Sequence, residues 1–505
     1  MSGLRTLSST GLLGALVLGV VGCASPPPPR VHDVGVKIPD TWSAQPDSTW
    51  SPDPAATHRP WWTSFGSAEL DSLITEALRR NNELAVIAAN VDAARAAVTI
   101  AGADRLPQIG GNAQGSRRKQ NFIGLPIPGA EGEVLSNYVT TVSLSVETTW
   151  ELDLWNRIGR RKAAAVADLQ ATEADLEAAR LSLAGLISKT FIQITEVQVQ
   201  LELAQRTEAA YRQTEDIALD RYRRGLISAF DVYLTRTQRE QASALAALRR
   251  NQLQQTSRQL ELLLSRYPAG KLKGADVLPP PPGSVPAGLP AELIARRPDL
   301  LAAERRLIAS RARISESRRA MLPQVRLTGS LGQTATELTD ILDGDFSVWS
   351  IAGALIQPLF QGGRLRAQVD LNEARGEAEL RLYVQSVLDA FGDVERALTA
   401  EGLLAEREGY LVDAVEAAES AWRLSETRYR QGVGTLLAVL EAQRRALEAE
   451  STLIAVRSER LLNRVDLHLA LGGGFESPMA AQSTSETASA RASRVEDPTD
   501  VAWRR

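Results

Sequence analysis

Few side chains in this sequence are of the types that catalyse reactions or bind metals. The chain contains three histidines, His32, His58 and His468, and one cysteine, Cys23. A His/Cys metal site needs three or four ligands held close together. A phosphate-binding loop needs a Lys after its glycines, and residues 472–474 are not followed by one. We therefore expect no metal site, no cofactor and no enzymatic activity.

The single cysteine lies where a covalent modification is expected. Arg5 precedes an apolar stretch, residues 12–21, which ends at Gly22 and Cys23. This layout resembles a bacterial lipoprotein signal, in which residues 1–22 are removed and Cys23 carries the lipid; the alternative is an unmodified thiol. By the same resemblance, Ala24 stands where an Asp would retain the protein at the inner membrane, which implies the outer membrane.

The charge balance argues against one class of partner. The chain has 57 Lys and Arg residues against 61 Asp and Glu residues. A nucleic-acid binder needs a basic excess to neutralise phosphates. We therefore expect no nucleic-acid partner.

One segment of this sequence occurs twice, with small changes. Residues 221–232 read RYRRGLISAFDV and residues 428–439 read RYRQGVGTLLAV, at an offset of 207 with no gap. The segments LPQI (106–109) and LPQV (322–325) repeat at an offset of 216. A unit of about 210 residues that is used twice predicts two pseudo-symmetric halves of one structure.

The repeat divides the chain into segments. The first repeat is expected over residues 66–265 and the second over residues 298–474. Residues 23–65, with many Pro, Asp, Ser and Thr, are expected to form a lipidated N-terminal tether, and the Pro-rich residues 266–297 to link the halves. The Ser-, Thr- and Ala-rich tail 475–505 is expected to be disordered.

Each repeat is predicted to begin with helices and then to change to strands. Ser67 is a candidate N-cap for the first helix, an Ala-rich helix follows over about 83–105, and its copy begins at Pro298. Apolar and polar residues then alternate, as in Val325, Leu327 and their neighbours. This alternation predicts two hairpins, whose strands lie at about 107–116, 138–150, 324–334 and 346–357.

A very long helical stretch follows each hairpin. Residues 154–223 contain no Pro and would form a helix about 100 Å long. The chain then returns over 229–265, and the second copy runs over 364–429 and 435–471. Four glycines in this copy predict bends or close contacts: Gly376, Gly392, Gly402 and Gly409. Each returning helix is expected to stack end to end on the helix before the strands.

The strands constrain how the chain can meet a membrane. No segment after residue 22 offers the 18 apolar residues expected of a spanning helix, so a spanning structure would have to be a closed β-barrel. Four strands are too few to close one, because barrels begin at about eight. The sequence therefore predicts an oligomer, and a dimer, trimer or tetramer would each be compatible with it.

An ordered set of motifs resembles the outer membrane factor family, of the lipidated TolC/OprM/NodT type. The motifs include both LPQ entries and both RYRxG turns, and the others are WWTSFGSAELDSLITEALRRNNEL (61–84), ELDLWNRIGRR (151–161), RRPDLLAAERRL (296–307), QPLFQGGRLRA (357–367) and LALGGGF (469–475). The resemblance covers about residues 36–475.

This resemblance implies a mainly α-helical fold with four strands per chain. Three chains would close a twelve-stranded transmembrane β-barrel in a homotrimer, with the helices forming an α-barrel tunnel. The implied function is the outer membrane channel of a tripartite efflux system. Its partners would be outer membrane lipid, a periplasmic adaptor and an inner-membrane pump. The transport would be passive.

The resemblance also suggests site residues near the two turns. In relatives, acidic residues near the second turn surround the pore in a stretch that ends in Asp-Ala, and Glu441-Ala442 stands there in this chain. We expect Glu441 to be a gate residue whose pKa mutual repulsion raises; the alternative is an ordinary solvated acid. Asp231 is a second candidate, although an Asp at a helix start usually serves the helix dipole.

The turns themselves are the expected docking point for the adaptor. Gly225 and Gly432 allow the positive φ at which a helix ends. The neighbouring side chains are expected to contact the adaptor or to pack between helices: Arg221, Tyr222, Arg223, Arg428, Tyr429 and Arg430. A rival interpretation is a periplasmic adaptor or structural coiled-coil lipoprotein, which would have one helical hairpin and no paired strands.

Overall fold

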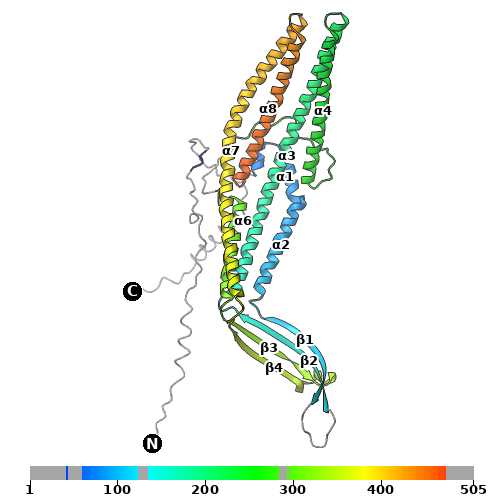
Figure 1. The fold of residues 1–505 in the computed structure, drawn as a ribbon. Helices are drawn as coiled ribbons and strands as arrows, with labels where there is room; N and C mark the ends of the chain where they lie inside the picture. The colour runs from blue at the N-terminus through cyan, green and yellow to red at the C-terminus, as the bar shows by residue number, and fades with distance from the viewer. Residues whose placement is uncertain (1–40, 44–59, 123–134, 284–292, 295, 474–505) are drawn as a thin grey trace, which may run out of the picture. The chain divides into compact units, whose positions relative to one another are not determined.

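The computed structural model describes residues 41–43, 60–122, 135–283, 293–294 and 296–473. Cys23, the signal segment 1–22, most of the tether 23–65 and the whole tail 475–505 lie outside the described residues. Within the described part, long helices carry one antiparallel sheet at one end and two hairpin turns at the other (Figure 1).

The two halves contain helices of equal length. A pair of 22-residue helices precedes the strands, a pair of 67-residue helices follows them, and a pair of 35-residue helices returns from the turns. At 1.5 Å per residue the longest pair spans about 100 Å. In the same order the pairs are α2 (Asn82–Ala103) and α6 (Pro298–Arg319), α3 (Arg157–Arg223) and α7 (Arg364–Arg430), and α4 (Ala229–Leu263) and α8 (Leu436–Ala470).

Each returning helix ends where the helix before the strands begins. The side-chain amide of Asn81, the N-cap of α2, donates a hydrogen bond to the carbonyl oxygen of Leu263 at 2.9 Å. In the second half, Nη1 of Arg297, the N-cap of α6, donates to the carbonyl oxygen of Ala470 at 3.2 Å. The predicted end-to-end stacking is therefore confirmed in both halves.

The four strands form one continuous sheet in the order β1-β2-β3-β4, with every neighbouring pair antiparallel. β1 and β2 are longer than predicted, because the first hairpin continues past Val142↔Ala335, the last pair between β2 and β3. Two short 3-10 helices, η4 (Leu338–Leu342) and η5 (Gly344–Phe346), connect β3 to β4. The strands are β1 (Gln108–Phe122), β2 (Leu135–Leu152), β3 (Gln324–Ala335) and β4 (Ser347–Ile356).

The main core begins earlier in the chain than the expected start of the first repeat at residue 66. The 3-10 helix η3 (Trp61–Phe65) is buried in it, and α1 (Ala68–Arg80) follows with Ser67 as its N-cap. The Trp61 ring stacks on the ring of His468 in α8, with centroids 5.1 Å apart. Aromatic burial of this kind holds the segment against the helices despite its polar surroundings in sequence.

Linker residues 266–283 lie along α3 and α4 as a strap. Glu261 accepts hydrogen bonds from the backbone N–H groups of Gly270 and Lys271, at 2.6 and 2.9 Å. The hydroxyl of Thr195 in α3 accepts one from the N–H of Ala275 at 3.1 Å. These bonds fix the backbone of the strap without regular secondary structure.

Among the described residues, only one of the four glycines of α7 makes a close contact. A Cβ at Gly376 would lie 2.8 Å from Ile314 in α6, whereas nothing lies within 4 Å of that position at Gly402 and Gly409. α7 is a single unbroken helix. The expectation of close packing therefore holds at Gly376 but not at Gly402 and Gly409.

One sequence expectation about membrane spans was wrong. Within the described residues, α2 is long and apolar enough to cross a membrane, with a mean hydropathy of 1.5 over its best 18-residue window. The Leu, Val and Ile residues of the helix, together with its many alanines, produce that value. The helix nevertheless carries Asp92 and Arg95, which pair at 2.8 Å.

Candidate functional site: the sheet faces and the hairpin turns

One face of the sheet is apolar and exposed. Leu331 in β3 lies opposite Val146 in β2 and opposite Trp349 in β4, so the three side chains share a face. Leu331 is 64% exposed, Trp349 73% and Ile351, further along the same face, 81%. A row of exposed apolar side chains of this size is typical of a surface that meets lipid or another protein.

The opposite face is mostly polar, with Val139, Val348 and Ile356 as apolar exceptions. Ser330 lies opposite both Glu147 and Ser350, and the hydroxyls of Ser330 and Ser350 are hydrogen-bonded at 2.8 Å. The strands thus alternate between apolar and polar residues, which is the pattern of a barrel with lipid outside and water inside.

The sheet has two open edges. Among the described residues, β1 pairs only with β2 and β4 pairs only with β3. The outer backbone N–H and C=O groups of both strands therefore lack ladder partners in the part of the chain that the structure describes. Such edges are stable in a membrane only when another strand pairs with them.

Matching side chains join the sheet to the helices in both halves. Trp150 Nε1, near the end of β2, donates to the carbonyl oxygen of Arg105 at 3.0 Å. Gln357 Nε2, just after β4, donates to the carbonyl oxygen of Met321 at 3.1 Å. Trp155 adds a bond from its Nε1 to the carbonyl oxygen of Pro323 at 2.5 Å. These bonds fix the strand ends relative to the ends of α2 and α6.

Both hairpin turns have the same backbone geometry. Gly225 and Gly432 take φ values of +73° and +82°. The N–H of Gly225 donates to the carbonyl oxygen of Tyr222 and that of Leu226 to the carbonyl oxygen of Arg221, at 2.8 and 2.9 Å, and the second turn repeats both bonds. This is the Schellman helix ending, which favours Gly at its left-handed position.

The structure brings some of the predicted docking residues together and leaves others apart. Arg221 lies over the buried ring of Tyr429, 4.3 Å from its centroid, which links the two turns by a cation–π contact. Arg430 pairs with Glu426 at 2.5 Å. The remaining side chains, Tyr222, Arg223 and Arg428, are exposed.

Sequence reasoning missed the apolar side chains beside the turns. Leu226 and its copy Val433 are each 64% exposed, and Phe230 and its copy Leu437 are 71% and 68% exposed. Large apolar residues that stay exposed at matching positions of both repeats are candidates for a partner contact. Their recurrence at the offset of 207 was the signal that could have revealed them.

Glu441 lies on α8 beside two arginines. Its carboxylate accepts hydrogen bonds from Arg445 Nε at 2.7 Å and from Arg444 Nη2 at 3.0 Å. The hydrogen bonds from Arg444 and Arg445 lower the pKa of Glu441 to about 2. Within one chain the shift is therefore opposite to the expected rise, because side chains one turn away supply positive charge that the gate motif did not include.

The Asp231 side chain takes part in capping the N-terminus of α4. Its Oδ2 accepts hydrogen bonds from the backbone N–H of Ser228 at 3.1 Å and from the Ser228 hydroxyl at 2.9 Å, within the capping box of α4. This geometry serves the helix start.

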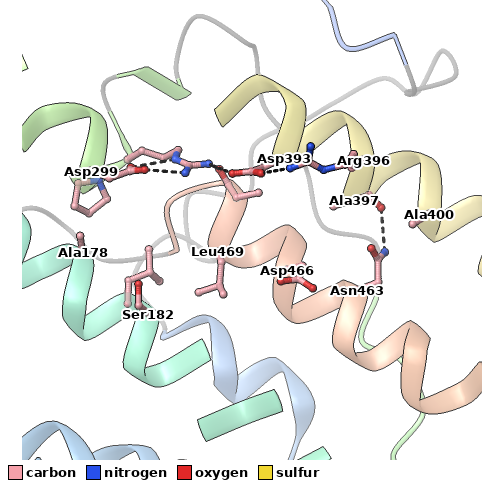
Figure 2. Close-up of a pocket in the computed structure, with 14 residues that line it drawn as sticks. Ala178, Ser182, Asp299, Asp393, Arg396, Ala397, Ala400, Asn463, Asp466 and Leu469 are labelled. Atoms are coloured by element: carbon pink, nitrogen blue, oxygen red, sulfur yellow. Dashed lines mark hydrogen bonds and ion pairs between the residues drawn. The ribbon is translucent and has the colours of Figure 1, made fainter. Parts of the chain in front are cut away.

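A cavity of about 490 Å³ lies where α3, α6, α7 and α8 meet (Figure 2). Its charged groups are all paired: Arg297 lies between Asp299 and Asp393, at 2.8 and 3.2 Å, and Arg396 also pairs with Asp393. Asp466 pairs with Lys189, which lies outside the lining. Among the described residues, no three His, Cys, Asp or Glu side chains are grouped to hold a metal ion. The cavity therefore offers paired charges and, among the described residues, no ligand cluster for a metal ion.

A sheet with one lipid-compatible face, one polar face and two open edges, carried on helices about 100 Å long, defines a class of protein. It is the class of membrane channels that combine a shared β-barrel with a helical extension. The chain belongs to the outer membrane efflux protein family, whose sequence profile matches residues 73–266 and 289–473. Its fold, its channel class and its outer membrane location are those of this family.

Individual relatives cover almost the whole chain. Outer membrane protein OprJ of Pseudomonas aeruginosa is 33% identical over 475 residues, which are 92% of this chain and 96% of that protein. The pyoverdine export outer membrane protein OpmQ of Pseudomonas putida is 31% identical over 465 residues, 91% of this chain and 96% of OpmQ. The solved outer-membrane channel OprN is 28% identical, with a TM-score of 0.78 over 87% of this chain and 98% of OprN.

Proposed function

We propose that three copies of this chain close a twelve-stranded barrel in the outer membrane, as a passive duct of a tripartite efflux system with no catalytic step. The observation that carries the proposal is the four-stranded sheet with an apolar face, a polar face and two open edges. Pairing β4 of one copy with β1 of the next leaves no edge in lipid.

The chain is anchored by a lipid on Cys23, after removal of residues 1–22. The apolar stretch before Cys23 and the absence of any other cysteine support this assignment. A Cys23→Ser variant that no longer incorporates labelled palmitate supports it, and unchanged labelling overturns it.

The hairpin turns dock on a periplasmic adaptor, which connects the duct to an inner-membrane pump. The exposed pairs Leu226/Val433 and Phe230/Leu437 supply apolar contact area, and Arg223 and Arg428 supply charge beside them. The proposed contact surface for the adaptor therefore includes the hairpin turns of both repeats.

Glu441 lines the gate near the second turn, with Arg444 and Arg445 as its partners. Three copies would then place three carboxylates around the axis, each beside two guanidinium groups. Asp231 contributes to the gate by holding the start of α4 in place.

The rival function, an adaptor or structural coiled-coil lipoprotein, predicts a protein that does not form a pore. Purified full-length protein in detergent should have the mass of a trimer and should conduct ions in planar bilayers. A monodisperse monomer without conductance would exclude the duct.

Docking is tested separately from the pore. Phe230→Ser combined with Leu437→Ser should reduce export in cells that carry the cognate adaptor and pump, while conductance in bilayers stays unchanged. Leu248→Ser, at an exposed position on α4 far from the turn, is the matched control and should leave export intact. Equal export by all variants would refute docking at the tips.

A further inference from the structure

Three consecutive cations lie in the half of β1 that leads away from the helices. The register separates them onto two faces: Arg117 lies opposite Thr140 and Lys119 opposite Tyr138, whereas Arg118 lies opposite Val139. Because side chains alternate along a strand, Thr140 and Tyr138 continue the row that contains Val146 and Leu331. Arg117 and Lys119 therefore lie on the apolar face, and Arg118 lies on the polar face.

The two cations on the apolar face share one aromatic ring. The guanidinium carbon of Arg117 is 5.6 Å from the centroid of Tyr138, and Nζ of Lys119 is 5.5 Å from it. Tyr138 is 57% exposed. Among the described residues, neither cation forms an ion pair with a carboxylate. Their positive charge is thus available to a ligand.

This cluster lies just beyond the end of the apolar row on β2. From Leu152 to Val142 the row spans about 34 Å along β2, which is about 26 Å along the membrane normal at a tilt of about 40°. That height matches the apolar band of about 25 Å in outer membrane barrels. Arg117 then lies about 5 Å beyond the band and Lys119 about 10 Å beyond it, at the depth of lipid headgroups.

We propose that Arg117, Lys119 and Tyr138 form an external binding site for the phosphate groups of outer-leaflet lipids. The inference rests on the proposed function, which places the apolar face in lipid and this end of the strands away from the periplasm. Two cations flank an aromatic side chain at the membrane surface, where Tyr is favoured and where each basic residue attracts anionic headgroups. The site lies on β1, so an assembled trimer carries three copies.

The test uses purified full-length protein and native mass spectrometry. The probe is lipid A with both phosphates, compared with the same lipid after removal of its phosphates. Wild-type protein should prefer the phosphorylated form. Each of Arg117→Gln and Lys119→Gln should raise the apparent Kd about 5-fold, and the double variant about 30-fold. The trimer mass in the same spectra verifies assembly of each variant.

Arg118→Gln is the matched control, because it removes one charge from the same strand but from the opposite face. It should change the Kd less than about twofold, since a charge on the polar face does not touch the lipid. Equal effects of Arg118→Gln and Arg117→Gln, or equal binding of the two lipids by wild-type protein, would overturn the site. Conductance is measured on the same samples. If the wild-type protein conducts ions but binds both lipids equally, only this inference is contradicted. If the wild-type protein does not conduct ions, the proposed duct is contradicted.

Discussion

Asn81 and Leu263 join two helices end to end. The side-chain amide of Asn81 donates to the carbonyl oxygen of Leu263 at 2.9 Å, while its own oxygen accepts from the N–H of Leu84 at 3.0 Å. The offsets of 216 and 207 carry Asn81 onto Arg297 and Leu263 onto Ala470, and Arg297 donates to the carbonyl oxygen of Ala470. The contact is thus kept in both repeats although the residue type has changed.

Asn81→Ala should lower the free energy of unfolding by about 1–3 kcal/mol, because it removes a helix cap and leaves the half-buried Leu263 carbonyl without this partner. The measurement is the apparent Tm of the detergent-solubilised protein. Asn82→Ala, at the exposed neighbouring position, should leave the Tm nearly unchanged. Equal shifts for the two variants would show that the junction contributes nothing.

Gly274→Ala should displace the strap from α3. A Cβ at Gly274 would lie 2.6 to 2.7 Å from backbone and side-chain atoms of Thr195, whereas Gly283, further along the strap, has nothing within 4 Å. Overpacking of this kind costs about 1–3 kcal/mol. Limited proteolysis should therefore cut the 266–283 segment faster in Gly274→Ala than in Gly283→Ala. Identical cleavage rates would contradict the close contact.

The Trp61–His468 stack should make stability depend on pH. Burial, together with the positive charge of Arg464, lowers the pKa of His468 to about 4, against about 6.5 in an unfolded chain. Below pH 6.5 the unfolded state therefore binds a proton that the folded state does not. The stabilisation present above pH 6.5 is lost progressively as the pH falls toward 4, by about 2 kcal/mol at pH 5.

His468→Phe keeps an aromatic ring at this position and removes the titration. The drop in apparent Tm between pH 7.5 and pH 5 should be smaller in this variant than in the wild type. The carboxylates titrate equally in both proteins, so the difference isolates the His468 imidazole. A drop of the same size in both would show that the histidine is protonated as easily in the folded chain as in the unfolded one.

Glu441 should stay charged throughout the ordinary pH range. Its pKa of about 2 lies below that of a free Glu, so its charge is lost only when the pH falls toward 2. The ion selectivity of the channel, read from reversal potentials under a salt gradient, should be constant between pH 7 and pH 4.5. A change in ion selectivity near pH 5 would instead indicate that mutual repulsion between three carboxylates raises the pKa of Glu441.

Glu441→Gln should shift the reversal potential toward anions, because Arg444 loses one of its carboxylates and Arg445 loses its partner. Glu426→Gln is the matched control, since Glu426 pairs with Arg430 in the same i,i+4 arrangement beside the turn on α7. It should shift the potential less. Equal shifts in both variants would assign the effect to general surface charge.

The repeat was the part of the fold that could be predicted, because helix length follows from local pattern. Residues without Pro, with periodic apolar positions and a Gly at the turn, specify α3 and α7 to within a few residues of the observed ends. The strand faces were also predictable from alternation at Val325 and Leu327, since a strand has a period of two.

Contacts between distant side chains could not be predicted in the same way. The ion pairs that lower the pKa of Glu441 depend on the rotamers of Arg444 and Arg445, which a motif does not specify. The burial of Trp61 depends on His468, about 400 residues away. Such contacts arise from tertiary packing and leave no local period to detect.

The open edges of β1 and β4 have a consequence for mixtures of normal and damaged chains. In the proposed trimer, β1 and β4 of each protomer pair with strands of its two neighbours. One copy with a defective edge strand therefore prevents the barrel from closing, even when both neighbours are intact. If half of the chains carry such a defect and assemble at random, only about one-eighth of trimers contain three intact copies. A mutation in β1 or β4 that blocks pairing but permits assembly would therefore act dominantly over a normal gene in the same cell.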